Sequence, residues 1–238
     1  MLALVAVLYT SIFPLSASRF YEELGLDGRA YACARRASKT LSGEKQVNAL
    51  VSCVNLGGKL FDSGNGYAQN LVEDTTAFLD NSDCLKRCEK MDEYNLSTAP
   101  KTMRPNLYSY KTYIYELRAS AKAKLGEKDE LTNAISNLNK CDTETLAVKF
   151  GEISSHLKYG EKLSSEDIQN IKAIVKDYFN DVKRIMESGN DLKCLYLIKQ
   201  YQKVAVRTNE LAEIEYNGER HNINELYGAL LKEYSTKK

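Results

Sequence analysis

The chain has no tryptophan, only three prolines and only two histidines among its 238 residues. A serine or cysteine nucleophile usually needs a histidine base, so this scarcity leaves little room for such an active site. His156 follows two serines near the end of a predicted helix and should be partly exposed, and His221 should be solvated in a polar turn. Adjacent helical residues point about 100° apart, which is a poor geometry for pairing Ser155 with His156.

Sequence signals for other catalytic chemistry are also missing. Gly64-Asn65-Gly66 is not followed by the Lys-Ser/Thr pair of a phosphate-binding loop. Carboxylate pairs such as Glu213 with Glu215, or Asp129 with Glu130, are expected from composition on solvated helix faces. We therefore expect no enzyme, no catalytic residue and no cofactor.

A zinc site is excluded by the spacing of its usual ligands. Cys84 and Cys88 are four residues apart, but the chain has no second closely spaced cysteine pair. Both histidines lie far from Cys84 and Cys88 in the sequence. A structural zinc site usually combines two closely spaced pairs of cysteine or histidine ligands. We expect no metal.

The chain has almost no excess charge. Its 33 basic and 32 acidic residues give a formal net charge of +1, and the two signs are interspersed. Nucleic-acid-binding proteins usually carry a basic face or stripe, and anionic membrane surfaces attract similar clusters. We expect neither nucleic acid nor a membrane surface as a partner.

Long apolar runs are missing after residue 18, so no membrane span is predicted. The uncharged run Leu2–Tyr9 continues to Leu15 and is followed by Ser16-Ala17-Ser18, just before Arg19. An apolar stretch followed by small residues is typical of a secretory signal peptide, and it is shorter than the roughly 20 residues that span a bilayer. We predict that residues 1–18 are removed and that the protein is secreted.

Six cysteines lie in the predicted mature part of the chain: Cys33, Cys53, Cys84, Cys88, Cys141 and Cys194. An even number of cysteines in an oxidising compartment predicts three disulfides. Their spacing does not determine the connectivity.

Apolar residues recur at helical spacing over most of the chain, and no segment alternates at strand spacing. The strongest predicted helix covers 165–189, with Ser164 and Asp167 placed to cap it and Gly189 placed to end it. A long helix over 191–216 follows after a short turn, so these two should pack antiparallel. Further helices are predicted over 28–40, 44–61, 67–79, 82–94, 106–126, 127–139, 143–158 and 223–234. Gly57-Gly58 should weaken or bend the second of these.

The predicted fold class is all-α: a disulfide-stabilised multi-helix bundle with long antiparallel helices in its C-terminal half. After the signal peptide, residues 19–94 form an N-terminal, cysteine-richer helical part. Residues 95–106, which include Pro100 and Pro105, form an irregular connecting segment. Residues 107–238 form a C-terminal bundle. The two helical parts are either separate or one continuous domain.

The aromatic composition is biased, with 16 tyrosines against six phenylalanines. Tyr108, Tyr113 and Tyr115 crowd the beginning of one predicted helix. Tyrosine suits half-buried positions and is enriched in protein interfaces. These side chains either line the rim of the core or form an interaction surface.

Asn95-Leu96-Ser97 is the only N-glycosylation acceptor motif in the chain. It lies in the predicted irregular segment, where an exposed acceptor is expected. Glycosylation at Asn95 is therefore consistent with secretion.

Two functions remain open. The first is a secreted, non-catalytic binding protein of the surface, matrix, saliva or venom type, which contacts an extracellular protein through its tyrosines. The second is an extracellular carrier that encloses a small apolar ligand between helices. The sequence leaves the oligomeric state open.

Overall fold

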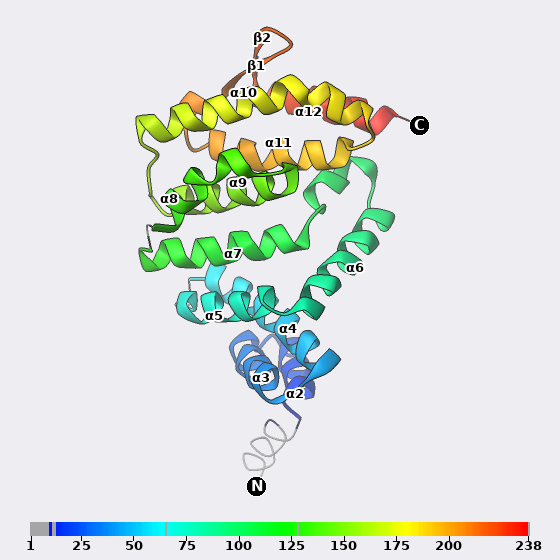
Figure 1. Ribbon diagram of the computed structural model, residues 1–238. Coiled ribbons are helices and arrows are strands. Elements are labelled where there is room, and N and C mark those ends of the chain that lie inside the picture. Colours follow the sequence, from blue (N-terminus) through cyan, green and yellow to red (C-terminus); the bar gives the residue numbers. More distant parts are fainter. Residues whose placement is uncertain (1–9, 11–12, 65, 128, 238) are drawn as a thin grey trace. The chain divides into compact units, whose positions relative to one another are not determined.

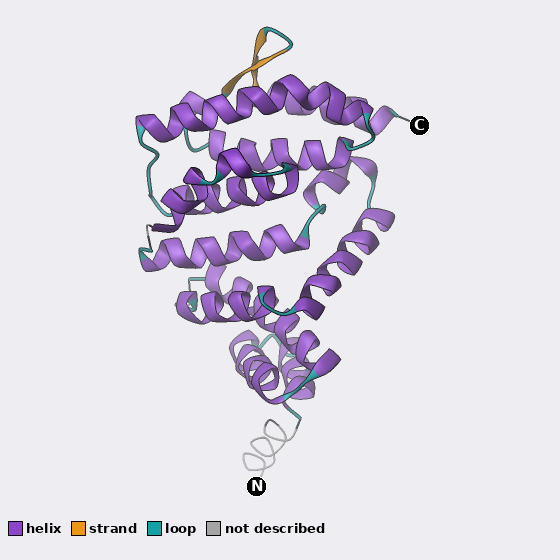
Figure 2. Ribbon diagram, viewed as in Figure 1, coloured by secondary structure: helices purple, strands orange, loops and turns teal. Residues whose placement is uncertain are grey.

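The computed structural model describes residues 10, 13–64, 66–127 and 129–237, and most of them are helical (Figure 2). This confirms the all-α multi-helix fold. The chain divides into two compact units between Cys88 and Glu89. The division falls inside the helix α6 (Ser82–Thr98) rather than in the predicted connecting segment 95–106.

Unit 1 is a stack of short helices. They are α2 (Pro14–Glu23), α3 (Asp27–Thr40), α4 (Gly43–Asp62) and α5 (Ala68–Leu79), followed by the first part of α6. In Figure 1, α3 packs against α2 and α4, and α4 packs against α5. Ala30 and Ala34 of α3 are fully buried, and their small side chains let the neighbouring helices approach closely.

Gly57 permits a close approach of helices within unit 1. A Cβ atom at this position would lie 3.2 Å from both Tyr31 Cε2 of α3 and Leu71 Cδ1 of α5. Helix α4 continues without a break through Gly57 and Gly58. The glycine pair therefore serves packing and does not end the helix.

A buried polar cluster joins α3 to α5. The Tyr31 hydroxyl donates a hydrogen bond of 2.5 Å to Asp74 Oδ2, and Arg35 Nε donates one of 2.9 Å to Asp74 Oδ1. Burial raises the pKa of Asp74, while the bonds from Tyr31 and Arg35 act in the opposite direction. Because its carboxylate accepts these hydrogen bonds, Asp74 can be buried inside unit 1.

Unit 2 contains the remaining elements. They are the end of α6, η1 (Lys101–Asn106), α7 (Tyr110–Leu125), α8 (Asp129–Ser136), η2 (Leu138–Lys140), α9 (Thr143–Lys158), α10 (Ser165–Glu187), α11 (Asp191–Ala205), η3 (Asn209–Leu211), β1 (Glu213–Tyr216), β2 (Glu219–Asn222) and α12 (Ile223–Thr236). Helix α9 packs between α7 and α11, and α11 also contacts α10 and α12 (Figure 1). The core of the unit is built around α9 and α11.

The two long helices behave largely as their sequence predicts. Ile171, Val175 and Val182 of α10 are buried, which confirms the apolar seam. Ser164 and Asp167 form the predicted capping box. Helices α10 and α11 run in opposite directions, as expected from the short turn between them (Figure 1).

The prediction that the second long helix continues to Tyr216 is wrong. Helix α11 ends at Ala205, and β1 pairs antiparallel with β2, with Ile214 opposite His221. Asn217 and Gly218 have φ angles of 53° and 80°, and an Asn-Gly pair with these angles is typical of a two-residue hairpin turn. The two short strands show little alternation of apolar and polar residues, so the Asn-Gly turn was the sequence feature that indicates the hairpin.

No disulfide joins the six cysteines, so the structure does not support disulfide stabilisation. Burial raises the pKa of the Cys53 thiol to about 12 and that of Cys194 to about 11, so both are protonated core side chains. Cys141 is partly exposed, and its thiol donates to the Asn137 carbonyl at 3.2 Å. Packing of helices, and not crosslinking, holds both units in this structure.

The predicted signal peptide lies mostly outside the described residues, which omit 1–9, 11 and 12. Its last residues belong to α2, where Ala17 and Ser18 are buried and the Ser18 hydroxyl donates to the Ala30 carbonyl at 2.9 Å. The predicted cleavage point before Arg19 therefore lies within a helix. Among the described helices, none has the length and apolar character to cross a bilayer.

The segment predicted to be irregular is largely ordered. Asn95 lies in the last turns of α6, and its carbonyl accepts the Ala99 amide at 3.0 Å. Residues 101–106 form the 3-10 helix η1, which includes Pro105. The glycosylation acceptor thus lies on a helix and is partly buried.

Candidate functional site

The candidate site is a groove of about 380 Å³ between α7 and α9, which we call the tyrosine groove. It is lined by Lys111, Tyr115, Arg118, Asp142, Glu144, Thr145, Val148, Lys149 and Glu152. The α7 residues follow each other at steps of four and three, so they form one stripe of that helix. Local helical spacing therefore places an aromatic ring between two cations.

Tyr115 and Arg118 form the centre of the α7 wall. The Arg118 guanidinium carbon lies 5.0 Å from the centroid of the Tyr115 ring, which is cation–π distance. Neither Lys111 nor Arg118 forms an ion pair with another described residue. The α7 wall therefore offers two cationic groups that a partner can reach.

The α9 wall has the opposite charge at its N-terminal end. Asp142 caps α9 by accepting the Thr145 amide at 2.8 Å, and that bond lowers the pKa of the Asp142 carboxyl. Glu144 follows on the first turn, whereas Glu152 is paired with Lys149 at 2.7 Å. The groove thus has a basic wall on α7 and an acidic end on α9.

The structure does not bring the three predicted tyrosines into one surface. Tyr115 lines the groove, but Tyr113 lies two residues before it, on the other side of α7, with 41% of its surface exposed. Tyr108 precedes the helix and packs against the core of unit 2, with its ring 5.3 Å from that of Tyr196. Burial, together with Glu144 and Asp92, raises the pKa of Tyr108 to about 12.

The prediction that His156 is partly exposed is wrong, whereas His221 keeps 31% of its side-chain surface exposed. His156 is 0% exposed, because the C-terminal half of α9 is covered by neighbouring helices and even Ser154 and Ser155 are buried. The Ser155 hydroxyl donates to the carbonyls of Gly151 and Glu116, and it does not bond to His156. His221 is partly buried on β2, with its ring 5.9 Å from that of Tyr216.

No group of three or more potential metal ligands gathers among the described residues. The buried partner of His156 is Glu161, whose Oε1 lies 2.7 Å from Nδ1. This pair was missed because its burial arises from helices distant in sequence.

The chain matches no protein-family model, no curated protein and no solved structure.

Proposed function

We propose that the protein is exported and works by binding, without catalysis, and that it holds an acidic segment of an extracellular protein in the tyrosine groove. The observation that carries this proposal is an accessible aromatic ring, Tyr115, that lies between two cations, Lys111 and Arg118, which form no ion pair within the described residues. Arginine and tyrosine are the residues that most often dominate protein interfaces. A partner carboxylate beside Arg118 would gain a charge-assisted hydrogen bond.

The acidic end of the groove would set the orientation of the partner. Glu144 repels carboxylates, so the acidic part of the segment should lie along Lys111 and Arg118. Val148 supplies an apolar patch on the facing wall. The binding should therefore weaken as salt concentration rises.

The alternative of a carrier that encloses an apolar ligand has less support. The tyrosine groove and the cavity beside α8 are each lined by several charged side chains. A purely apolar ligand would leave these groups without partners, which costs free energy. We therefore place the protein partner first.

Site-specific crosslinking tests the proposal. A photoreactive benzoylphenylalanine replaces Tyr115 in one variant and the 69% exposed Tyr94 of α6 in the control. In the extracellular fluid of the source, we expect a single crosslinked species from position 115 and none from position 94. Equal crosslinking from both positions, or none from 115, would contradict the proposal.

The affinity for the crosslinked partner then gives the energetic test. Tyr115→Ser and Arg118→Ala should each weaken the Kd about tenfold or more, which is roughly 1.4 kcal/mol, and Tyr94→Ser should not change it. Tyr108→Ser should instead lower the free energy of unfolding by about 2 kcal/mol, since it leaves a gap against Tyr196. A large loss of stability in Tyr115→Ser would mean that this ring belongs to the core.

A further inference from the structure

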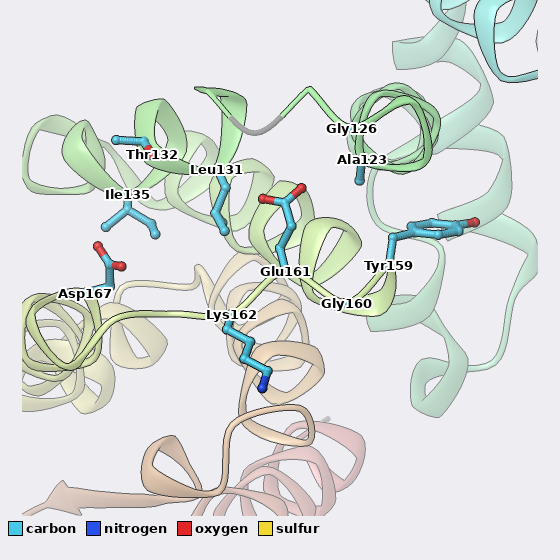
Figure 3. A pocket seen from close by; sticks show the side chains of 10 residues that line it. All are labelled: Ala123, Gly126, Leu131, Thr132, Ile135, Tyr159, Gly160, Glu161, Lys162 and Asp167. Carbon is cyan, nitrogen blue, oxygen red and sulfur yellow. The ribbon is translucent and has the colours of Figure 1, made fainter.

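A second cavity, of about 510 Å³, lies in unit 2 and shares no residue with the tyrosine groove. The end of α7, helix α8, the loop after α9 and the beginning of α10 enclose it (Figure 3). We call it the Glu161 pocket. Its volume falls in the range of about 300–1,000 Å³ that is typical of small-ligand sites.

One wall of the pocket is apolar, and the pocket opens to solvent. Leu131 and Ile135 of α8 project into it opposite the loop (Figure 3). Gly126 and Gly160 have φ angles of 82° and 92°, and a Cβ atom at either one would meet nothing within 4 Å. Without side chains at these two positions, the pocket stays accessible.

Glu161 supplies the polar group of the pocket. Its carboxylate points into the space between Leu131 and Ala123 (Figure 3). One oxygen pairs with His156 at 2.7 Å, and the side chain keeps 13% of its surface exposed. The second oxygen accepts no hydrogen bond from the described residues, so it is available to a ligand.

His156 holds this carboxylate in place. The His156 side chain is 1% exposed, and its Nε2 has no hydrogen-bond partner among the described residues. The contact between Nδ1 and Oε1 therefore fixes the orientation of the Glu161 side chain at the wall of the pocket.

The lysines near the pocket form no ion pair with Glu161 among the described residues. The Lys162 side chain extends away from the Glu161 carboxylate (Figure 3). Lys122 pairs with Glu130 at 2.5 Å and lies 3.8 Å from Glu127. The other carboxylate on the wall, Asp167, uses Oδ2 to cap α10 with Ser164. Within the described structure, the pocket thus holds a largely buried carboxylate that forms no ion pair with a lysine or an arginine.

We propose that the Glu161 pocket binds a small primary amine with an apolar body. The ammonium group donates to the second oxygen of Glu161, and the apolar body packs against Leu131 and Ile135. Ammonium matches both the charge and the acceptor-only character of a carboxylate. This proposal stands independently of the tyrosine groove, because the two sites share no residue.

Titration with 2-phenylethylamine tests it, with 2-phenylethanol and 3-phenylpropanoate as neutral and anionic counterparts. We expect the amine to bind with a Kd in the millimolar range or tighter, the alcohol at least tenfold more weakly, and the acid not at all. The methyl NMR signals of Leu131 and Ile135 should shift on addition of the amine. Absence of amine binding at 10-fold excess over about 1 mM, or shifts confined to other residues, would overturn the proposal.

Two variants and a control locate the effect. Glu161→Gln keeps the shape but removes the charge, and it should weaken amine binding at least tenfold. Thr132→Trp fills the pocket from an exposed position and should abolish binding even if Glu161→Gln fails to fold. Glu166→Gln, on the exposed first turn of α10 outside the pocket, should bind as the unchanged protein does. Unchanged amine affinity in folded Thr132→Trp would overturn the assignment to this pocket.

Discussion

At the scale of single residues, Asp92 shows how burial alters an ordinary side chain. Its carboxylate accepts the Tyr110 amide at 2.7 Å, at the beginning of α7. Burial raises the pKa of Asp92 to about 6, although the Tyr110 bond acts in the opposite direction, and Glu144 and Glu89 add repulsion. An aspartate in the unfolded chain has a pKa of about 3.9.

This difference predicts a contribution to stability that depends on pH. Between about pH 4 and pH 6 the folded protein binds more protons at Asp92 than the unfolded chain does, so stability falls as pH rises through this window. Asp92→Asn keeps an acceptor for Tyr110 but carries no charge. We expect it to be more stable than the unchanged protein at pH 7.5 and to differ little at pH 4.

Urea unfolding at both pH values measures this difference. Subtracting the free energy of unfolding of one protein from that of the other cancels the contributions of the carboxylates that both proteins share. Glu93→Gln, an exposed neighbour on α6, serves as the control and should show no such pattern. A stability difference between Asp92→Asn and the unchanged protein that is the same at pH 4 and pH 7.5 would contradict the prediction.

At the scale of elements, the hairpin and the helices differ in what their glycines do. Gly218 has a φ of 80° in the turn between β1 and β2, where an L side chain is strained. Gly228 lies on an exposed face inside α12, with nothing within 4 Å of an added Cβ. The same substitution should therefore have opposite effects at the two positions.

We expect Gly218→Ala to lower the free energy of unfolding by about 1 kcal/mol, because the left-handed backbone conformation is unfavourable for alanine. Gly228→Ala should raise it by about 0.5–1 kcal/mol, because alanine favours the helix. Chemical denaturation of both variants measures the two changes. Loss of stability in both would show that Gly228 contributes to packing.

Agreement between sequence and structure is closest for elements whose signals are local. Helix α9 has the predicted bounds, 143–158, and the Ser164–Asp167 capping box is present. Asn217-Gly218 also carried a local hairpin signal, but the flanking residues continue the helical pattern and concealed it. The candidate site was predicted only in part, because Tyr115 is identified by its type while its partners depend on how α7 meets α9.

At the scale of the whole molecule, export and the state of the cysteines are linked. An oxidising compartment would pair thiols, whereas the structure holds no disulfide. Unit 1 carries Cys33, Cys53, Cys84 and Cys88, and burial raises the pKa of the Cys84 thiol to about 11. Buried thiols with a raised pKa react slowly in the folded protein.

Analysis of the protein isolated from its source without reductant tests export. We expect an N-terminus at Arg19 and, after unfolding, six thiols that alkylate without prior reduction. The same protein made in a reducing cytosol serves as the control and should show six thiols. An intact N-terminus would contradict export, and disulfides in the natural protein would contradict the free cysteines of the structure.

The sequence by itself determined the helices and their caps, because hydrophobic periodicity and capping depend on residues only a few positions apart. Only the tertiary structure decided which helix faces are covered. It buried His156 against Glu161, placed Tyr108 on Tyr196 and left Tyr115 in a groove. These outcomes depend on contacts between segments far apart in the chain, and a side chain at the edge of an apolar stripe has the same local pattern whether a neighbouring helix covers it or not.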